Sequence, residues 1–201
     1  MKQVSMVILI SALCATMTFG QENNQKIEIG ETVLRHQVGS SIFVVSNLFP
    51  DPADYYILTY GYHMTPKDVL IVETWTWTVY EPIGTYGSSD ELYPGKIVSY
   101  GVGAGYQRFH WKNFYTTIEA TPLMQQYYDT EDKKIQKGWQ LYCQFIAGYR
   151  FEFSKDRMFI EPALALKYWP IDTNYPDSFA EIEDGTPIHT FEPGLNFGFR
   201  F

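Results

Sequence analysis

The chain is 201 residues long, the size of one ordinary domain, and its formal net charge of −8 argues against a nucleic-acid partner. Aromatic residues make up 17% of the chain, with 16 Tyr and 14 Phe, which is rich for a water-soluble domain. The mean hydropathy of −0.22 excludes a protein built from membrane-spanning helices.

The first twenty residues are typical of a secretory signal peptide. The basic start Met1–Gln3 precedes an apolar stretch from Val4 to Thr18, and we expect cleavage after Gly20. This stretch is too short for a membrane anchor. Cys14 is preceded by leucine, where a lipoprotein signal needs a small residue, so we expect no lipidation. Cys143 is then alone, and we expect no disulfide bond, no metal site and no cofactor.

A glycine followed by an aromatic residue recurs along the rest of the chain, and three of these pairs precede a short polar turn and an apolar run. The pairs are Gly61-Tyr62, Gly105-Tyr106, Gly148-Tyr149 and Gly198-Phe199. The repeat indicates a series of β-hairpins. It predicts eight strands near 39–48, 54–64, 69–81, 96–109, 114–126, 139–153, 158–169 and 189–201. Longer connections rich in loop-forming residues are expected at 82–95, 127–138 and 170–188.

The last predicted strand shows the pattern most clearly. Apolar residues at alternate positions, from Phe191 to Phe201, are separated by polar or small ones. Period 2 indicates a strand with two unlike faces. Large apolar faces on nearly every strand, with no helix predicted to cover them, favour an all-β, eight-stranded antiparallel up-and-down transmembrane β-barrel. A soluble β-sandwich is the alternative fold.

Two strands have ambiguous faces. In the third strand Glu73 shares its face with Trp75 and Trp77, so either both tryptophans point inward or a bulge changes the phase. The first strand, which includes Ser41–Ser46, does not separate into an apolar and a polar face.

The signal peptide, the eight alternating strands and the end Gly198-Phe-Arg-Phe201 resemble the small outer-membrane β-barrel proteins of Gram-negative bacteria. The Glu161-Pro-Ala-Leu and Glu192-Pro-Gly-Leu strands are similar to those of porin-like barrels common in Bacteroidota. The resemblance implies a monomer that contacts outer-membrane lipid and lipopolysaccharide, with Phe201 as an assembly signal for the barrel-assembly machinery. It divides the chain into a signal peptide (1–20), a short periplasmic segment (21–37) and the barrel (38–201).

Charged side chains gather on the faces expected to line the lumen. An eight-stranded barrel is only wide enough for its own side chains, and buried charges must pair, so we expect a filled lumen with a charge network. We expect Arg200 to pair with Glu161 or Glu192; the alternative is an ion path or a paired-carboxylate active site. The network comprises Glu73, Glu119, Arg150, Glu152, Glu161, Lys167, Glu192 and Arg200, with Asn196 on the same faces.

Three functions remain open from the sequence. The first is a non-enzymatic envelope scaffold whose outer loops make surface contacts. The second is a narrow channel or carrier for small solutes, along small residues such as Gly101, Gly103 and Gly105. The third is a lipid-modifying enzyme, because some eight-stranded barrels act on lipid A, but such chemistry needs a histidine near a hydroxyl at the outer rim. Only His189 lies there, with Thr190, Ser88, Ser89 and Ser178 as companions, and we assign no catalytic residue.

Other features of the loop side have simple explanations. Acidic clusters in two loops are expected to be solvated, with divalent cations at the lipopolysaccharide surface as the alternative; they are Asp129, Glu131 and Asp132, and Asp172, Asp177, Glu181, Glu183 and Asp184. Aromatic residues near the strand ends are expected to form two membrane-interface belts. They are Tyr62, Tyr106, Tyr149 and Phe199 at one end, and Tyr80, Tyr127, Tyr128, Tyr168 and Trp169 at the other. A sugar-binding platform of Tyr128, Tyr168 and Trp169 is the alternative.

Overall fold

A computed structural model describes residues 34–50, 52–82, 92–184 and 186–201; the predicted signal peptide lies outside this part of the chain. The described residues form strands and two short helices. The elements are β1 (His36–Ser41), η1 (Ile42–Leu48), β2 (Tyr55–His63), β3 (Asp68–Val79), β4 (Lys96–Trp111), β5 (Phe114–Tyr128), β6 (Lys134–Tyr149), β7 (Phe151–Phe153), β8 (Met158–Asp172), α2 (Asp177–Glu183) and β9 (His189–Arg200).

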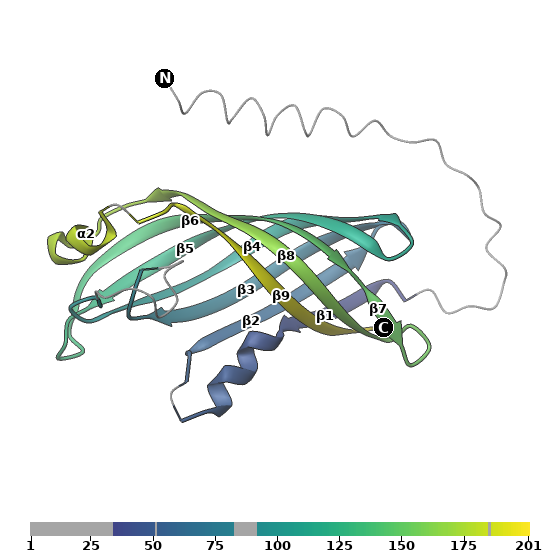
Figure 1. Cartoon of the computed structure of the whole chain (residues 1–201), viewed down its shortest axis with the longest axis horizontal. Coiled ribbons are helices and arrows are strands. Elements are labelled where there is room, and N and C mark those ends of the chain that lie inside the picture. Colours follow the sequence, from purple (N-terminus) through teal and green to yellow (C-terminus); the bar gives the residue numbers. More distant parts are fainter. Residues whose placement is uncertain (1–33, 51, 83–91, 185) are drawn as a thin grey trace, which may run out of the picture. The chain divides into compact units, whose positions relative to one another are not determined.

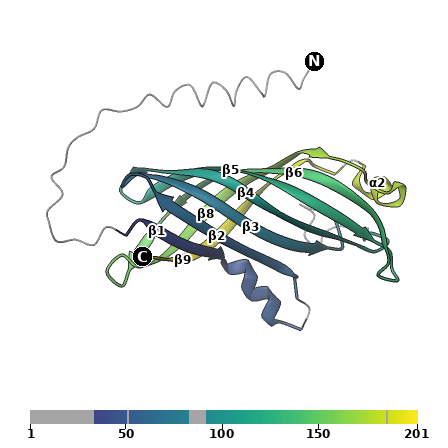
Figure 2. The ribbon, with the colours of Figure 1, turned by 180° about the vertical axis from the view of Figure 1, so that it is seen from behind.

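The strands close into a barrel, because the first strand pairs with the last. Val38 of β1 lies opposite Phe199 of β9, and every pairing in the sheet is antiparallel. Successive strands are neighbours around the ring, which gives up-and-down topology (Figures 1 and 2). Where β1 pairs with β2 and β9, closure removes the sheet edges that an open sheet would expose.

The short strand β7 is the continuation of β6. Gly148 of β6 lies opposite Ala163 of β8, and Phe151 of β7 lies opposite Ile160, in the same register. The interruption is at Arg150, directly after the residue that lies opposite Pro162, and Pro162 has no N–H to donate to the ladder. Counted as one strand, β6 and β7 give a closed eight-stranded antiparallel barrel, which confirms the predicted fold class.

Alternation separates an apolar outer face from a polar lumen. On β9, Phe191, Phe197 and Phe199 are exposed on the outside, whereas Glu192 and Asn196 face inward and are half-buried. On β3, Glu73 and Trp75 are both buried, and neither neighbouring strand pairs with β3 through a register shift. The tryptophans of β3 therefore share the inner face with Glu73, as the first of the two alternatives predicted.

The prediction of a strand over 39–48 is wrong in its second half. β1 ends at Ser41, and Ile42–Leu48 forms the 3-10 helix η1, which projects away from the barrel wall (Figures 1 and 2). Side-chain hydroxyls stabilise this change, because the Ser41 Oγ accepts a hydrogen bond from the Phe43 N–H and the Ser46 Oγ donates to the Phe43 carbonyl at 2.6 Å. Such local bonds compete with strand pairing. The barrel also begins at His36 rather than at residue 38.

The two ends of the barrel differ. One end carries three short turns between strands and also Phe201, whose N–H donates to the His36 carbonyl at 2.9 Å; we call it the turn end. The other, which we call the loop end, carries α2 and the longer connections (Figure 1). The predicted loop 127–138 shrinks to a few residues, because β5 and β6 extend into it. No helix among the described residues is long and apolar enough to cross a membrane.

Two of the predicted belt residues do not lie in a belt. Tyr127 is fully buried and Trp169 is nearly so, both in side-chain clusters inside the barrel. The prediction used only their position near strand ends, but the face of the strand decides whether a side chain points outward or into the barrel. Tyr128 and Tyr168, on the outer face, remain half-exposed, so the predicted sugar platform with Trp169 is not assembled.

Candidate functional site

The lumen is blocked near the turn end by a buried charge pair. The Arg150 Nε donates to the Glu161 Oε1 at 2.7 Å, and the two side chains are only 1% and 7% exposed. A second guanidinium nitrogen of Arg150 donates to the Gln107 Oε1 at 3.3 Å. The guanidinium also lies over the rings of Phe109 and Phe159, 4.7 and 4.1 Å from their centroids. The ion pair and the cation–π contacts together offset the desolvation cost of burying the guanidinium.

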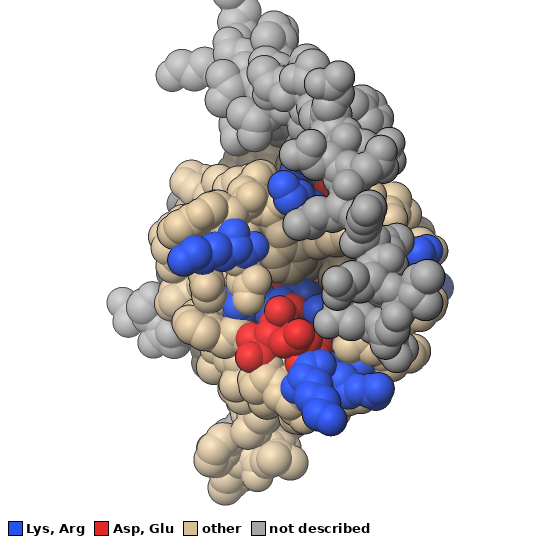
Figure 3. Space-filling model, turned by 90° about the vertical axis from the view of Figure 1, so that its right-hand side faces the viewer, with Lys and Arg blue, Asp and Glu red and all other residues tan. Residues whose placement is uncertain are grey.

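Further polar contacts close the turn end around that pair. His63 Nε2 donates to the Gln37 Oε1 at 2.9 Å in a buried contact. Arg200 donates to the Glu152 Oε1 at 2.9 Å, so the expectation that Arg200 pairs with Glu161 or Glu192 is wrong. Arg150 takes Glu161, and Lys167 takes Glu192 at 2.5 Å. Figure 3 looks at this end, where acidic and basic side chains lie side by side.

The middle of the lumen holds two carboxylates whose partners are neutral. Thr121 donates to Glu73 at 3.2 Å, and Gln144 donates to Glu119. Both glutamates are buried, and neither forms an ion pair with any described residue. Lys167 acts on Glu73 electrostatically but forms its ion pair with Glu192, so neutral donors supply the direct contacts of both buried carboxylates.

A second set of side chains covers the loop end of the lumen. Phe179 of α2 is fully buried and packs with Tyr93 and Tyr127 in a cluster that also contains Val79 and Ile97. The Tyr93 hydroxyl donates to the Glu183 carboxylate. Burial, with Glu183 as the next cause, raises the pKa of the Tyr93 phenol well above its ordinary value. Helix α2 is therefore held down as a cover.

Below that cover, a second aromatic cluster narrows the lumen. Trp75, Tyr142 and Trp169 pack with Leu123, and the rings of Trp75 and Tyr142 meet edge to face at 5.5 Å. A cavity of about 290 Å³ remains in the same part of the barrel, next to Glu73 and Glu119. The volume suits a small or single-chain molecule and not a wide aqueous pore.

The row of glycines on β4 does not line an open path. A Cβ added to Gly101 would lie 2.2 Å from the Pro122 carbonyl oxygen, and one added to Gly103 would lie 2.0 Å from the Thr121 Oγ1. These positions are filled by the neighbouring strand β5. The glycines permit close approach of β4 and β5 and offer no channel along their face.

The remaining candidate residues do not gather into a reactive site. His189 is exposed at the start of β9 and Ser178 is exposed on α2, whereas Ser88 and Ser89 lie outside the described residues. Within the described ranges, no group of three or more histidine, cysteine, aspartate or glutamate side chains is arranged to hold a metal ion. Asp132 in one acidic loop pairs with Lys96 at 2.7 Å. Cys143 is a free thiol, half-buried.

Sequence reasoning missed the neutral residues that complete the lumen. Gln107, Thr121 and Gln144 hold the buried charges, and Phe159 stacks on Arg150, yet none was predicted as a site residue. The signal was present in the alternation, because glutamine and threonine occupy inward positions on strands whose other face is apolar.

Comparison with known proteins gives one structural likeness. The N-terminal β-barrel domain of Pseudomonas aeruginosa OprF matches with a TM-score of 0.44 and 14% identity, covering 84% of this chain and 98% of that one. No family model matches the chain, and no curated protein matches it significantly.

Proposed function

We propose that the protein is an integral outer-membrane β-barrel whose outer face contacts lipid. The observation that supports this most is the number of large apolar side chains exposed on the outside of every strand from β2 to β9. They include Leu58, Leu70, Val102, Ile118, Trp139, Phe151, Leu164 and Phe197. A soluble monomer rarely exposes so continuous an apolar surface, and a closed barrel satisfies its backbone hydrogen bonds without water.

The role that the geometry favours is non-enzymatic. The lumen is occupied at the turn end by Arg150 and Glu161, and at the loop end by the cluster around Phe179, so it offers no continuous aqueous path. Among the described residues, no hydroxyl is arranged beside His189 so that the imidazole could act as a catalytic base. The protein then serves as a monomeric envelope scaffold, with its acidic loops directed to lipopolysaccharide or other surface contacts.

Cell fractionation and electrophoresis test the membrane assignment. We expect the protein in the outer-membrane fraction, and we expect the unboiled protein to migrate faster than the boiled one, because a closed barrel resists detergent. Recovery of the protein as a soluble periplasmic or extracellular species would contradict it.

Planar-bilayer recording tests the filled lumen separately. The expected result is no stable conductance step for the wild type. Stepwise conductance from a heat-modifiable, membrane-inserted sample would overturn the scaffold assignment and favour the narrow channel.

A further inference from the structure

The barrel wall is incomplete on the loop side of β1. The last pair between β1 and β9 joins Ser41 to Asn196, and the last between β1 and β2 joins Gly39 to Thr59. Beyond these pairs the chain leaves the wall as η1. In the described structure, β9 from His189 to Leu195 is then paired only with β8, and β2 from Tyr55 to Leu58 only with β3. A gap therefore separates the upper halves of β2 and β9.

Side chains satisfy the backbone along this gap in place of a strand. The Asn47 amide donates to the Tyr55 carbonyl at 2.6 Å and accepts from the Tyr55 N–H at 3.2 Å. The Ser40 hydroxyl donates to the Ile57 carbonyl at 2.6 Å. On the opposite margin, Pro193 has no N–H that needs a partner. On the β2 margin these bonds satisfy the N–H of Tyr55 and the carbonyls of Tyr55 and Ile57 without another strand.

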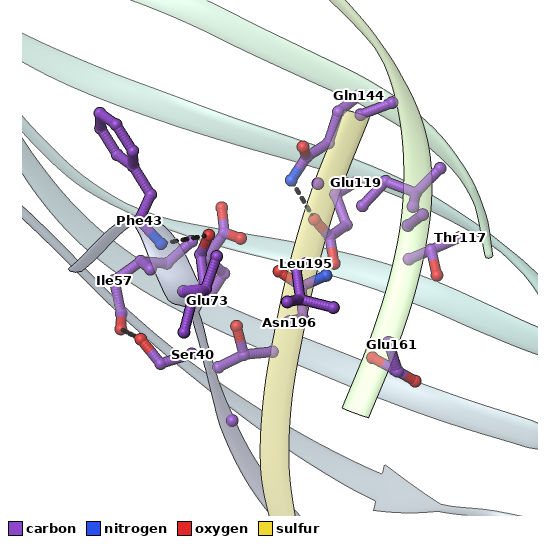
Figure 4. A pocket seen from close by; sticks show the side chains of 18 of the residues that line it. Ser40, Phe43, Ile57, Glu73, Thr117, Glu119, Gln144, Glu161, Leu195 and Asn196 are labelled. Atoms are coloured by element: carbon purple, nitrogen blue, oxygen red, sulfur yellow. Dashed lines mark hydrogen bonds between the residues drawn. The ribbon is translucent and has the colours of Figure 1, made fainter. Parts of the chain in front are cut away.

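The cavity in the lumen reaches through the gap. It is lined both by inward residues of β9, such as Gly194, and by outward ones, such as Leu195 and Phe197, so it passes around the free edge of this strand. A Cβ added to Gly194 would meet no atom within 4 Å. Figure 4 shows Phe43 and Ile57 on one side of this pocket, with Leu195 and Asn196 across it.

The two ends of the cavity have opposite chemistry. At the mouth, Ile42 and Phe43 of η1 and Leu195 of β9 line the cavity and are exposed. At the inner end lie Glu73 and Glu119, while the nearby cation Lys167 is held by Glu192. An apolar entrance leading to two carboxylates that form no direct ion pair with a described residue matches a molecule with a hydrocarbon chain and a cationic headgroup.

We propose that the gap between β2 and β9 is a lateral portal through which a single-chain amphiphile with a primary ammonium headgroup enters the lumen from the lipid. The ammonium group is bound by Glu73 and Glu119, and the hydrocarbon chain lies between Phe43 and Leu195. The proposal rests on the membrane location proposed above, because the mouth opens in the lipid-facing belt. It adds a ligand site to the scaffold.

Fluorescence quenching in lipid nanodiscs tests entry. Two variants of the full chain each keep one of the 5 tryptophans, either Trp75, which lines the cavity, or Trp139, which faces outward. Dodecylamine brominated on its chain is the probe, and each sample is first checked for heat-modifiable migration. We expect the amine to quench both tryptophans, with saturation for Trp75. Quenching of Trp139 without quenching of Trp75 would overturn the portal, whereas absence of quenching at both would overturn the membrane location instead.

A variant that blocks the gap distinguishes entry of the amine through the gap from entry by another route. Gly194→Phe places a ring in open space, so we expect the barrel to fold and the amine to quench Trp75 about tenfold less at equal concentration. The matched control is Ile118→Phe, which adds a similar ring on the outer face of β5, away from the gap, and should leave quenching unchanged. Equal quenching of Trp75 in both variants would overturn the lateral route.

The headgroup assignment has its own test. Brominated lauric acid has a carbon chain of the same length as dodecylamine but an anionic headgroup. We expect it to quench Trp75 about tenfold less than the amine does. Glu73→Gln combined with Glu119→Gln should remove this preference while keeping the heat-modifiable band. An equal response to amine and acid in the wild type would overturn the ammonium site.

Discussion

Arg150 is the residue whose buried contacts fill the lumen near the turn end. Its side chain is 1% exposed and its charge is balanced by Glu161, with Phe109 and Phe159 on the faces of the guanidinium. Removing one partner of a buried ion pair leaves the other charge uncompensated, which costs more than the pair contributes. The sequence placed both residues on lumen faces, but it could not show which carboxylate each cation takes, because the choice depends on register across strands.

We therefore expect Arg150→Met to lower the free energy of unfolding by about 3–5 kcal/mol. The loss should be measured by urea unfolding in lipid vesicles, with band migration as a second readout. Arg150→Met combined with Glu161→Gln should recover most of it, because no buried charge then remains.

The solvent-exposed pair Lys96–Asp132 is the matched control. Its side chains are 26% and 75% exposed, so Lys96→Ala should change stability by less than about 1 kcal/mol. A loss in Lys96→Ala as large as that in Arg150→Met would contradict the assignment of the Arg150 pair as the main electrostatic constraint.

At the scale of elements, sequence patterns predicted neither η1 nor α2, which falls within the predicted loop 170–188. The alternation correctly gave β2 to β9 to within a few residues, because each has one apolar and one polar face. Residues 42–48 are rich in β-formers, and their propensity is overridden by local bonds from Ser41, Ser46 and Asn47. The serine bonds are with the Phe43 backbone and the Asn47 bonds with the Tyr55 backbone, and periodicity reveals neither partner.

Asn47→Ala tests this account of η1. It removes both side-chain bonds to the Tyr55 backbone, and we expect a loss of about 1–3 kcal/mol with faster amide hydrogen exchange at Tyr55. Exchange at Val72, in the middle of β3, should not change. Unaltered protection of Tyr55 would show that Asn47 does not hold the edge of β2.

Helix α2 and Tyr93 give the loop end a pH dependence. Because burial and Glu183 raise the pKa of the Tyr93 phenol above its ordinary value of 10.0, the folded state keeps this proton at a pH where the unfolded chain loses it. The contribution is complete below about pH 10 and falls as pH rises above it. Tyr175 has a raised pKa through burial, Asp172 and Glu183, and acts in the same direction.

We expect the free energy of unfolding, measured in urea, to fall as pH rises above about 10, with a decline that is shallower in Tyr93→Phe by up to about 1.4 kcal/mol per pH unit. Tyr80→Phe, which changes an exposed tyrosine nearby in the chain, is the control and should follow the wild type. Identical slopes for the wild type and Tyr93→Phe would contradict the role of this phenol.

For the whole molecule, sequence patterns predicted the barrel architecture but not the cavity or the gap in the wall. Period-2 patterns and recurrent turns suffice for an eight-stranded barrel, because each strand carries its own signal. The cavity and the gap in the wall are collective properties: they depend on where β1 stops relative to Asn196 and Thr59, and no local pattern encodes that. The contacts of the neutral lumen residues Gln107, Thr121 and Gln144 likewise depend on the register between strands, so a local pattern does not predict them.

The central claim is that the outer face of the barrel contacts bilayer phospholipids, whereas Trp75 inside the barrel does not. Nanodiscs made with phospholipids brominated on their acyl chains test it with the two single-tryptophan variants. We predict strong quenching of Trp139, which is 52% exposed on the outside, and little quenching of Trp75, which is 6% exposed inside the barrel. Equal quenching of both, or quenching of Trp75 alone, would contradict the assignment of faces, and quenching of neither would contradict insertion of the barrel in a membrane.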